Sequence, residues 1–333
     1  IANTFAGNGT ITAEGGIGAA NPVWGSGGGG RVAIEYTSST FSGSVSVAGG
    51  AHDYNRGQPG TLWEPKKFLG LQGSASSPED ITIDGSYQYC FTNAAPTNYW
   101  NLTITNGNWV EFHDGSLHIT DLILTNDLAT LRFDKDKGGT DGFDMESLSI
   151  TGSIHISDGS TLALSAEGIY NLSGDLDILS TNSTLYVFGN TTVTNEQSGG
   201  TAGTPHGIGV TINCQNASIL GTINADGLGF PGGQGPGAGG GSGGGTYGGK
   251  GGRVSSAPYG STNQPTALGS GGRAPDAGGG AVKLIVSNAL TLNGTVSACG
   301  SGVSWYGAAG GSIWLIANTF AGNGTITAEG GIG

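Results

Sequence analysis

Four aspartates in one short segment form the part of the sequence best suited to binding a metal ion. The segment reads D-K-D-K-G-G-T-D-G-F-D, and its aspartates are Asp134, Asp136, Asp141 and Asp144. Ca²⁺ takes roughly six to eight hard oxygen ligands, which a loop rich in Asp and Gly can supply. The spacing differs from that of an EF-hand, and the two lysines weaken the local negative charge. The segment is a candidate calcium site, with a solvated turn between strands as the alternative.

The histidines and carboxylates do not form a pattern typical of catalysis. Glycosidases place two carboxyl groups in one cleft, and the N-x-D, D-D, G-H-G and R-x-K set of polygalacturonases is absent. The nearest fragment, Pro205-His206-Gly207, has no aspartate pair close to it in the sequence. His118 and His155 each stand between two apolar residues of a candidate strand. Because alternate residues of a strand face opposite sides, we expect both histidines to face solvent and to have no functional role. We therefore expect no enzymatic activity, with a polysaccharide lyase or hydrolase as the less favoured alternative.

Aromatic residues in glycine-rich stretches are the candidate contacts for sugars. Trp24, Trp305 and Tyr306 stand in such stretches, where their rings could stack on surface glycans or on a neighbouring filament. The alternative is that these rings cover the glycine-rich backbone and close the edges of the core.

Eight N-x-[ST] sequons make asparagine glycosylation a further candidate modification. Asn-Gly-Thr is also typical of tight turns, so a sequon of this kind has a purely structural explanation as well. The eight asparagines are Asn8, Asn101, Asn171, Asn182, Asn190, Asn216, Asn293 and Asn323.

Composition and charge exclude several functional classes. The formal net charge is −13, from 24 acidic and 11 basic residues, which disfavours nucleic acid and suits bound cations. No apolar run approaches the roughly 18 residues of a membrane span. Cys90, Cys214 and Cys299 are far apart and form no CxxC motif, so we expect buried free thiols. The only methionine is Met145 and no signal peptide is visible, which suggests mature or excised material.

The beginning of the sequence recurs without a change at its end. Residues 1–18 and 316–333 both read IANTFAGNGTITAEGGIG. This identity is too long for chance, so the offset between the two copies is a true period. Two explanations fit this period. The sequence is either a segment of a giant protein with tandem repeats or a subunit of a polymer whose repeat continues from one subunit to the next. Both predict a long fibre whose main partner is another copy of the same sequence.

Short alternating runs separated by glycines predict an all-β fold. Four stretches read strand, turn, G-[TS]-[VI]-x-[AV] and glycine, and they start near Val32, Val210, Val282 and Ile313. The alternation places Val, Ile, Leu and Ala inside and Thr, Ser and Asn outside. Units of about 30 residues without a helix cannot bury a face alone and must stack on one another. The predicted fold is a right-handed parallel β-helix, a β-solenoid, with glycine-rich loops.

One continuous solenoid is the predicted domain organisation. In its middle, candidate strands begin at Leu102, Leu122, Leu148 and Leu176. These starts recur at the spacing of roughly 20–30 residues that is typical of solenoid coils. Shorter strands lie between them, so we expect three strands per coil. The sections are glycine-rich coils over 1–70, regular coils over 71–205, and glycine-rich coils over 206–333, in which 316–333 starts the next repeat.

The stretch 226–280 holds 23 glycines. We interpret it as ordered loops that lie against the solenoid, because glycine permits close packing of one backbone on another. A flexible linker is the alternative.

Three strings carry a resemblance to known proteins: G-G-G-R-V-A-I, G-G-S-I-W-L and G-T-I-T-A-E-G-G. They resemble the glycine-rich repeats of very large bacterial surface proteins and the passengers of adhesins and autotransporters, which fold as right-handed β-helices. The resemblance covers residues 206–333 and 1–60, whereas the middle shares only the general spacing of pectin-lyase-like folds. It implies a structural role in an extracellular or cell-surface filament, with an adhesin or glycan-binding module as the alternative, and brings no catalytic motif.

Overall fold

The structure, a computed structural model, describes most of the chain. The described residues are 2–16, 26–34, 36–42, 44–47, 61–63, 79–84, 87–90, 99–105, 110–113, 115–125, 130–133, 145–166, 168–192, 206–241, 243–254, 256–302 and 306–333. Within them every regular element is a β-strand and there is no helix, as the alternating pattern predicts. The chain forms two compact units, Ile1–Leu148 and Ser149–Gly333.

Within its described residues, the first unit contains four groups of parallel strands. The groups are β1 (Ala2–Gly7) with β4 (Tyr36–Phe41); β2 (Thr10–Thr12) with β5 (Ser44–Ser46); β7 (Glu79–Asp84), β9 (Tyr99–Thr105) and β11 (Gly115–Leu124); and β3 (Arg31–Ala33), β6 (Thr61–Trp63), β8 (Tyr87–Cys90), β10 (Val110–His113) and β12 (Thr130–Phe133). Leu122 pairs with Leu102, and both side chains are fully buried. The prediction that a strand recurs at these two leucines is therefore confirmed, since the two strands pair in parallel.

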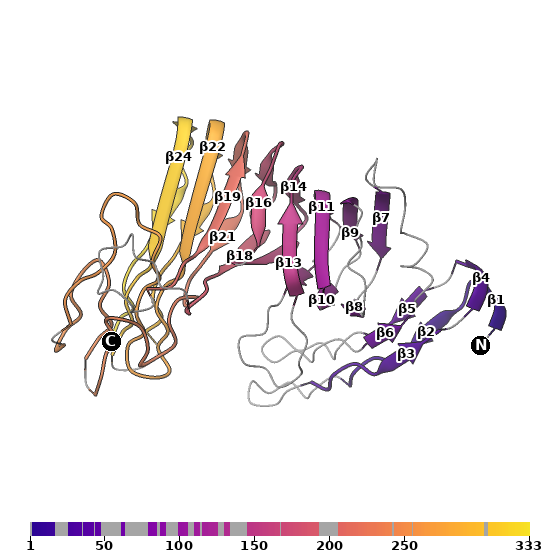
Figure 1. Ribbon diagram of the computed structural model, residues 1–333, viewed down its shortest axis with the longest axis horizontal. Coiled ribbons are helices and arrows are strands. Elements are labelled where there is room, and N and C mark those ends of the chain that lie inside the picture. The colour runs from indigo at the N-terminus through magenta and orange to yellow at the C-terminus, as the bar shows by residue number, and fades with distance from the viewer. Residues whose placement is uncertain are drawn as a thin grey trace. The chain divides into compact units, whose positions relative to one another are not determined.

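The second unit is built from layers of three strands, and each layer pairs in parallel with the next. The first strands are β13 (Met145–Ile150, which spans the unit boundary), β16 (Ile169–Asn171), β19 (Val210–Cys214) and the first halves of β22 (Ala281–Leu292) and β24 (Ser312–Ala321). The second strands are β14 (Ile154–Ile156), β17 (Leu176–Ile178), β20 (Ala217–Ile219) and the second halves of β22 and β24. The third strands are β15 (Thr161–Ser165), β18 (Thr184–Phe188), β21 (Thr222–Asn224), β23 (Thr295–Ser297) and β25 (Thr325–Thr327). Figure 1 shows β16, β19, β22 and β24 side by side.

The layers differ in length mainly where the third strand leads into the next layer. One position of the second strand can be traced from layer to layer through its pairing. The residues at this position are, in order, Ile154, Leu176, Ala217, Leu290 and Phe320. The sequence distance between successive members of this series is shortest from Ile154 to Leu176 and longest from Ala217 to Leu290. The connections that carry this variation are residues 166–168, 189–209, 225–280 and 298–311.

One prediction about the middle of the chain was wrong. Leu148 and Leu176 do not begin equivalent strands, because Leu176 pairs with Ile154 whereas β13 pairs with β16. Leu148 therefore belongs to the first strand of its layer and Leu176 to the second strand of the next.

Buried side chains form columns that run from layer to layer. Leu162, Leu185, Ile223 and Val296 pair in succession, and each is at most 1% exposed. Paired positions in parallel strands keep the same face, so each layer buries its apolar side chains on those of the next. Ile326 continues this column in the last of the described layers and is 47% exposed.

Candidate functional site

The glycine-rich connections of the second unit pack against one another through their backbones. Gly269 donates to the carbonyl of Gly279, Gly279 donates to that of Ala309, and Gly245 donates to that of Gly307, with N–O distances of 2.9, 2.9 and 3.0 Å. Gly279 is buried, and a Cβ on it would lie 2.1 Å from the carbonyl oxygen of Ala298. Glycine is required at such a position because another backbone fills the space of a side chain. The structure thus supports ordered loops over a flexible linker for 226–280.

A small polar cluster fixes these loops to the layers of strands. The Tyr247 hydroxyl lies 2.6 Å from Ser312 Oγ, which donates to the carbonyl of Ala267 at 2.6 Å. The Tyr259 hydroxyl donates to the carbonyl of Leu268 at 2.6 Å, and its ring centroid lies 4.9 Å from that of Tyr247. Burial raises the pKa of both tyrosines, so both stay neutral hydrogen-bonding groups. The two hydroxyls therefore hold the loops in place as neutral hydrogen-bonding groups.

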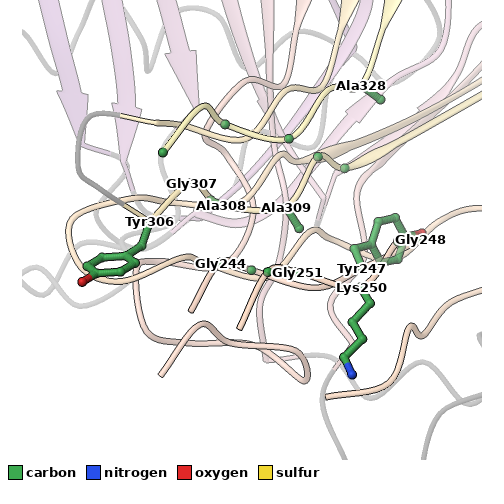
Figure 2. Close-up of a pocket in the computed structure, with 18 of the residues that line it drawn as sticks. Gly244, Tyr247, Gly248, Lys250, Gly251, Tyr306, Gly307, Ala308, Ala309 and Ala328 are labelled. Atoms are coloured by element: carbon green, nitrogen blue, oxygen red, sulfur yellow. The ribbon is translucent and has the colours of Figure 1, made fainter. Parts of the chain in front are cut away.

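A hollow of about 650 Å³ opens between these loops and the last layer. Its walls come from residues 244–245, 247–253 and 306–311 and from Ala328, Gly330, Gly331 and Gly333, mostly glycine and alanine. Figure 2 shows Tyr306 toward one end and Tyr247 with Lys250 toward the other, with small residues between them. Lys250 and Arg253 are its charged lining residues, and no carboxylate lines it among the residues that the structure describes. The hollow therefore lacks an acid–base pair and offers mainly backbone groups, which suits contact with another backbone.

The predicted calcium and aromatic sites lie largely outside the described residues. This applies to Asp134, Asp136, Asp141 and Asp144, and to Trp24 and Trp305. Within the described ranges, no group of three or more His, Cys, Asp or Glu side chains could hold a metal ion. Tyr306 is described and lines the hollow, with the guanidinium carbon of Arg273 5.6 Å from its ring centroid.

All eight sequon asparagines lie in the described part of the chain. In Asn101 and Asn216 the amide nitrogen, which is the atom that would carry a glycan, donates to Asp80 and Asp175 at 2.8 and 2.9 Å. Asn190 is half-buried and accepts from the backbone N–H of Thr192 at 2.8 Å. The exposed sequon asparagines are Asn8, Asn171, Asn182, Asn293 and Asn323. Glycosylation stays a prediction, which exposure favours at these five positions.

The expectation of an idle side chain was wrong for His155. Its Nδ1 lies 3.0 Å from Asp177 Oδ2, across paired strands β14 and β17. Desolvation raises the pKa of Asp177, and His155 opposes that rise. The pair therefore ties two neighbouring layers together.

The cysteines that the structure describes with their side chains carry free thiols, as predicted. Cys214 is buried and Cys299 is half-buried. Burial raises the pKa of the Cys214 thiol to about 12, so this thiol is a poor nucleophile at neutral pH. The side chain of Cys90 lies outside the described residues.

Comparisons with protein-family models, with curated proteins and with solved structures found no match. In the described residues, no helix is long and apolar enough to cross a membrane. Any function must therefore be inferred from the structure itself. Its main features are stacked parallel layers, glycine loops packed through their backbones, and a hollow at the last layer.

Proposed function

We propose that the chain is one repeat of an extracellular structural filament, built as a right-handed parallel β-solenoid. The observation that carries this proposal is the identity of residues 1–18 and 316–333, both of which supply strands that pair in parallel with a neighbouring layer. A sequence that returns to its starting phase at residue 316 can continue without a break.

The physical properties of stacked layers suit a filament. Each added layer lengthens the stack by roughly 4.8 Å and pairs the free strand edges of the layer before it. Stability is then close to a sum of layer and interface contributions, so length can grow without a larger core. The right-handed winding of the proposed solenoid and its extracellular location are inferred from the resemblance to surface-protein repeats.

Glycan binding is the second candidate function. Three residues that line the hollow favour this function. The ring of Tyr306 suits a polyhydroxylated ligand, and the cations Lys250 and Arg253 suit an acidic one. Quenching of aromatic fluorescence by added sugars measures this activity directly. Catalysis is not proposed, because the described lining of the hollow lacks a paired acid and base.

Denatured mass and electron microscopy of native material test the filament. A mass far above 33.0 kDa together with fibres indicates covalent tandem repeats. A mass near that of one chain together with fibres indicates subunits that stack end to end. Compact monomers of that mass would contradict the filament and favour the binding module.

A further inference from the structure

A second and smaller pocket lies at the start of strands β19 and β22. Its volume is about 200 Å³, and it shares no lining residue with the hollow. Its walls come from residues 208–211 and 281–283 and from Thr266. Figure 1 shows β16, β19, β22 and β24 in this order, and each pairs in parallel with the next. The pocket is thus built on paired strands that have a described layer on each side.

Parallel pairing brings three outward side chains of these layers into one row. Thr211 pairs with Lys283, and Lys283 pairs with Trp314. The neighbours of Thr211 in its strand, Val210 and Ile212, are fully buried, so strand alternation turns Thr211 outward. Thr211 is exposed, whereas Lys283 and Trp314 are half-buried. The row therefore lies on the outer face of the sheet, where a dissolved ligand can reach it.

Lys283 is the charged residue of the pocket. Its ammonium nitrogen lies 3.9 Å from the centroid of the Trp314 ring. Among the residues that the structure describes, no carboxylate lines the pocket or forms an ion pair with Lys283. A cation–π contact at a solvent-accessible site is weak. The ammonium of Lys283 is therefore available to an anion.

Hydroxyl groups are the other polar side-chain groups of the lining. They belong to Thr211 on β19 and to Thr266 in the glycine-rich connection, and Ile208 adds an apolar wall. A threonine hydroxyl donates one hydrogen bond and accepts up to two. A ligand that carries hydroxyl groups next to a negative charge can therefore use both threonines together with Lys283.

The Lys283 side chain belongs to the pocket and to the Trp314 contact at once. Lysine carries a compact charge on a flexible stem, so the ammonium can move from the ring to a ligand in the pocket. A charge-assisted hydrogen bond to a carboxylate is stronger than a cation–π contact at an accessible site. Binding of an anion therefore draws the ammonium away from Trp314 and changes the surroundings of the indole ring.

We propose that this pocket binds a small hydroxylated carboxylate, the chemistry of an acidic sugar residue. The ammonium of Lys283 binds the carboxylate, and the hydroxyls of Thr211 and Thr266 bind hydroxyl groups of the ligand. The pocket is smaller than the roughly 300–1,000 Å³ of sites for drug-sized ligands, so its ligand is small. The inference goes beyond the proposed filament, because the pocket belongs to the single chain.

Three matched ligands test the chemistry of the pocket in the full-length chain. Glucuronate carries the carboxylate and the hydroxyls, methyl glucoside carries only the hydroxyls, and acetate carries only the carboxylate. In ligand-observed NMR titrations at low salt, glucuronate should bind at least about tenfold more tightly than methyl glucoside. It should bind at least about threefold more tightly than acetate. Equal affinity of glucuronate and either of the other ligands would overturn the proposal.

Two substitutions test the residues of the pocket. Lys283→Met keeps an unbranched stem without the charge and should weaken glucuronate binding at least about tenfold. Thr211→Val keeps the shape of the side chain without the hydroxyl and should weaken it about threefold. Circular dichroism would show that both variants keep the fold.

Lys250→Met is the matched control, since Lys250 is exposed and lines the hollow instead. This variant should bind glucuronate as tightly as the wild type does. Wild-type affinity in Lys283→Met would overturn the proposal, as would a loss of binding in Lys250→Met, which would place the ligand in the hollow.

Tryptophan fluorescence tests the predicted movement of Lys283. Glucuronate should change the fluorescence of the wild type, and Trp314→Phe should remove this change while NMR still detects binding. A change of the same size in Trp314→Phe would show that the ligand lies at another tryptophan and would refute the site.

These tests are independent of the filament. Binding by a chain that forms no fibres would keep this pocket and contradict the filament. Fibres that do not bind glucuronate would leave the filament standing and remove this pocket.

Discussion

Gly279 lies where two other backbones leave no room for a side chain. A Cβ at this position would approach the carbonyl oxygen of Ala298 to 2.1 Å and the backbone nitrogen of Gly311 to 2.5 Å. Its own N–H and C=O bond to Ala309 and Gly269. Gly279→Ala therefore forces apart the segments that hold the glycine loops against the last two layers.

The expected cost follows from the two close contacts. Overpacking a tightly packed site costs about 1–3 kcal/mol, and more where only backbone can yield. For a unit of this size, about 1 kcal/mol lowers Tm by roughly 2–4 °C. We therefore expect Gly279→Ala to lower the Tm of the full-length chain by about 2–12 °C in differential scanning calorimetry.

Gly240→Ala is the matched control for this prediction. Gly240 is exposed, and a Cβ there meets nothing within 4 Å. The same added methyl should change stability little or raise it by about 0.4–1 kcal/mol, since it restricts only the unfolded chain. If the two variants melt at the same temperature, close backbone packing does not hold the loops, and 226–280 behaves as a linker.

Three further perturbations test the core and the buried polar groups. Leu185→Ala removes a fully buried column residue and should destabilise by about 2–5 kcal/mol in chemical denaturation; a loss below about 1 kcal/mol would argue against stacked columns. Tyr259→Phe leaves Leu268 O without its hydroxyl donor and should cost about 1–3 kcal/mol in the same assay, whereas an unchanged midpoint would show that the hydroxyl fixes nothing. Burial raises the pKa of Cys214 from 9.0 to about 12, so its contribution to stability is complete below about pH 9 and is lost as the pH rises toward 12. Tm should fall across that interval, and Cys214→Ala should reduce the slope; an unchanged slope would mean that this thiol ionises equally in both states.

The strands follow closely from the sequence where apolar and polar residues alternate. Two of the shorter strands expected between Leu148 and Leu176 are found as β14 and β15, because their inward residues are large and aliphatic. β16 was missed, since the apolar Ile169 is exposed and the more polar Tyr170 is buried, which reverses the usual contrast. β20 was missed as well, because alanine is one of its two inward residues.

The site was harder to predict than the strands. Glycine has no side chain, so a run such as 239–245 does not show which distant backbone it contacts. Gly245, for example, bonds to Gly307, and only the stacking of layers brings them together.

The connection from the third strand of each layer to the next layer, which varies most in length in the second unit, has a consequence for engineering. Residues 225–280 are accommodated between β21 and β22 while the strands on either side keep their parallel register with neighbouring layers. A guest peptide inserted into the corresponding connection at 298–311 would leave every strand pair in place. If the proposed filament forms, any cargo carried there would recur at the spacing of the repeat, so the scaffold could serve as a ruler for molecular display.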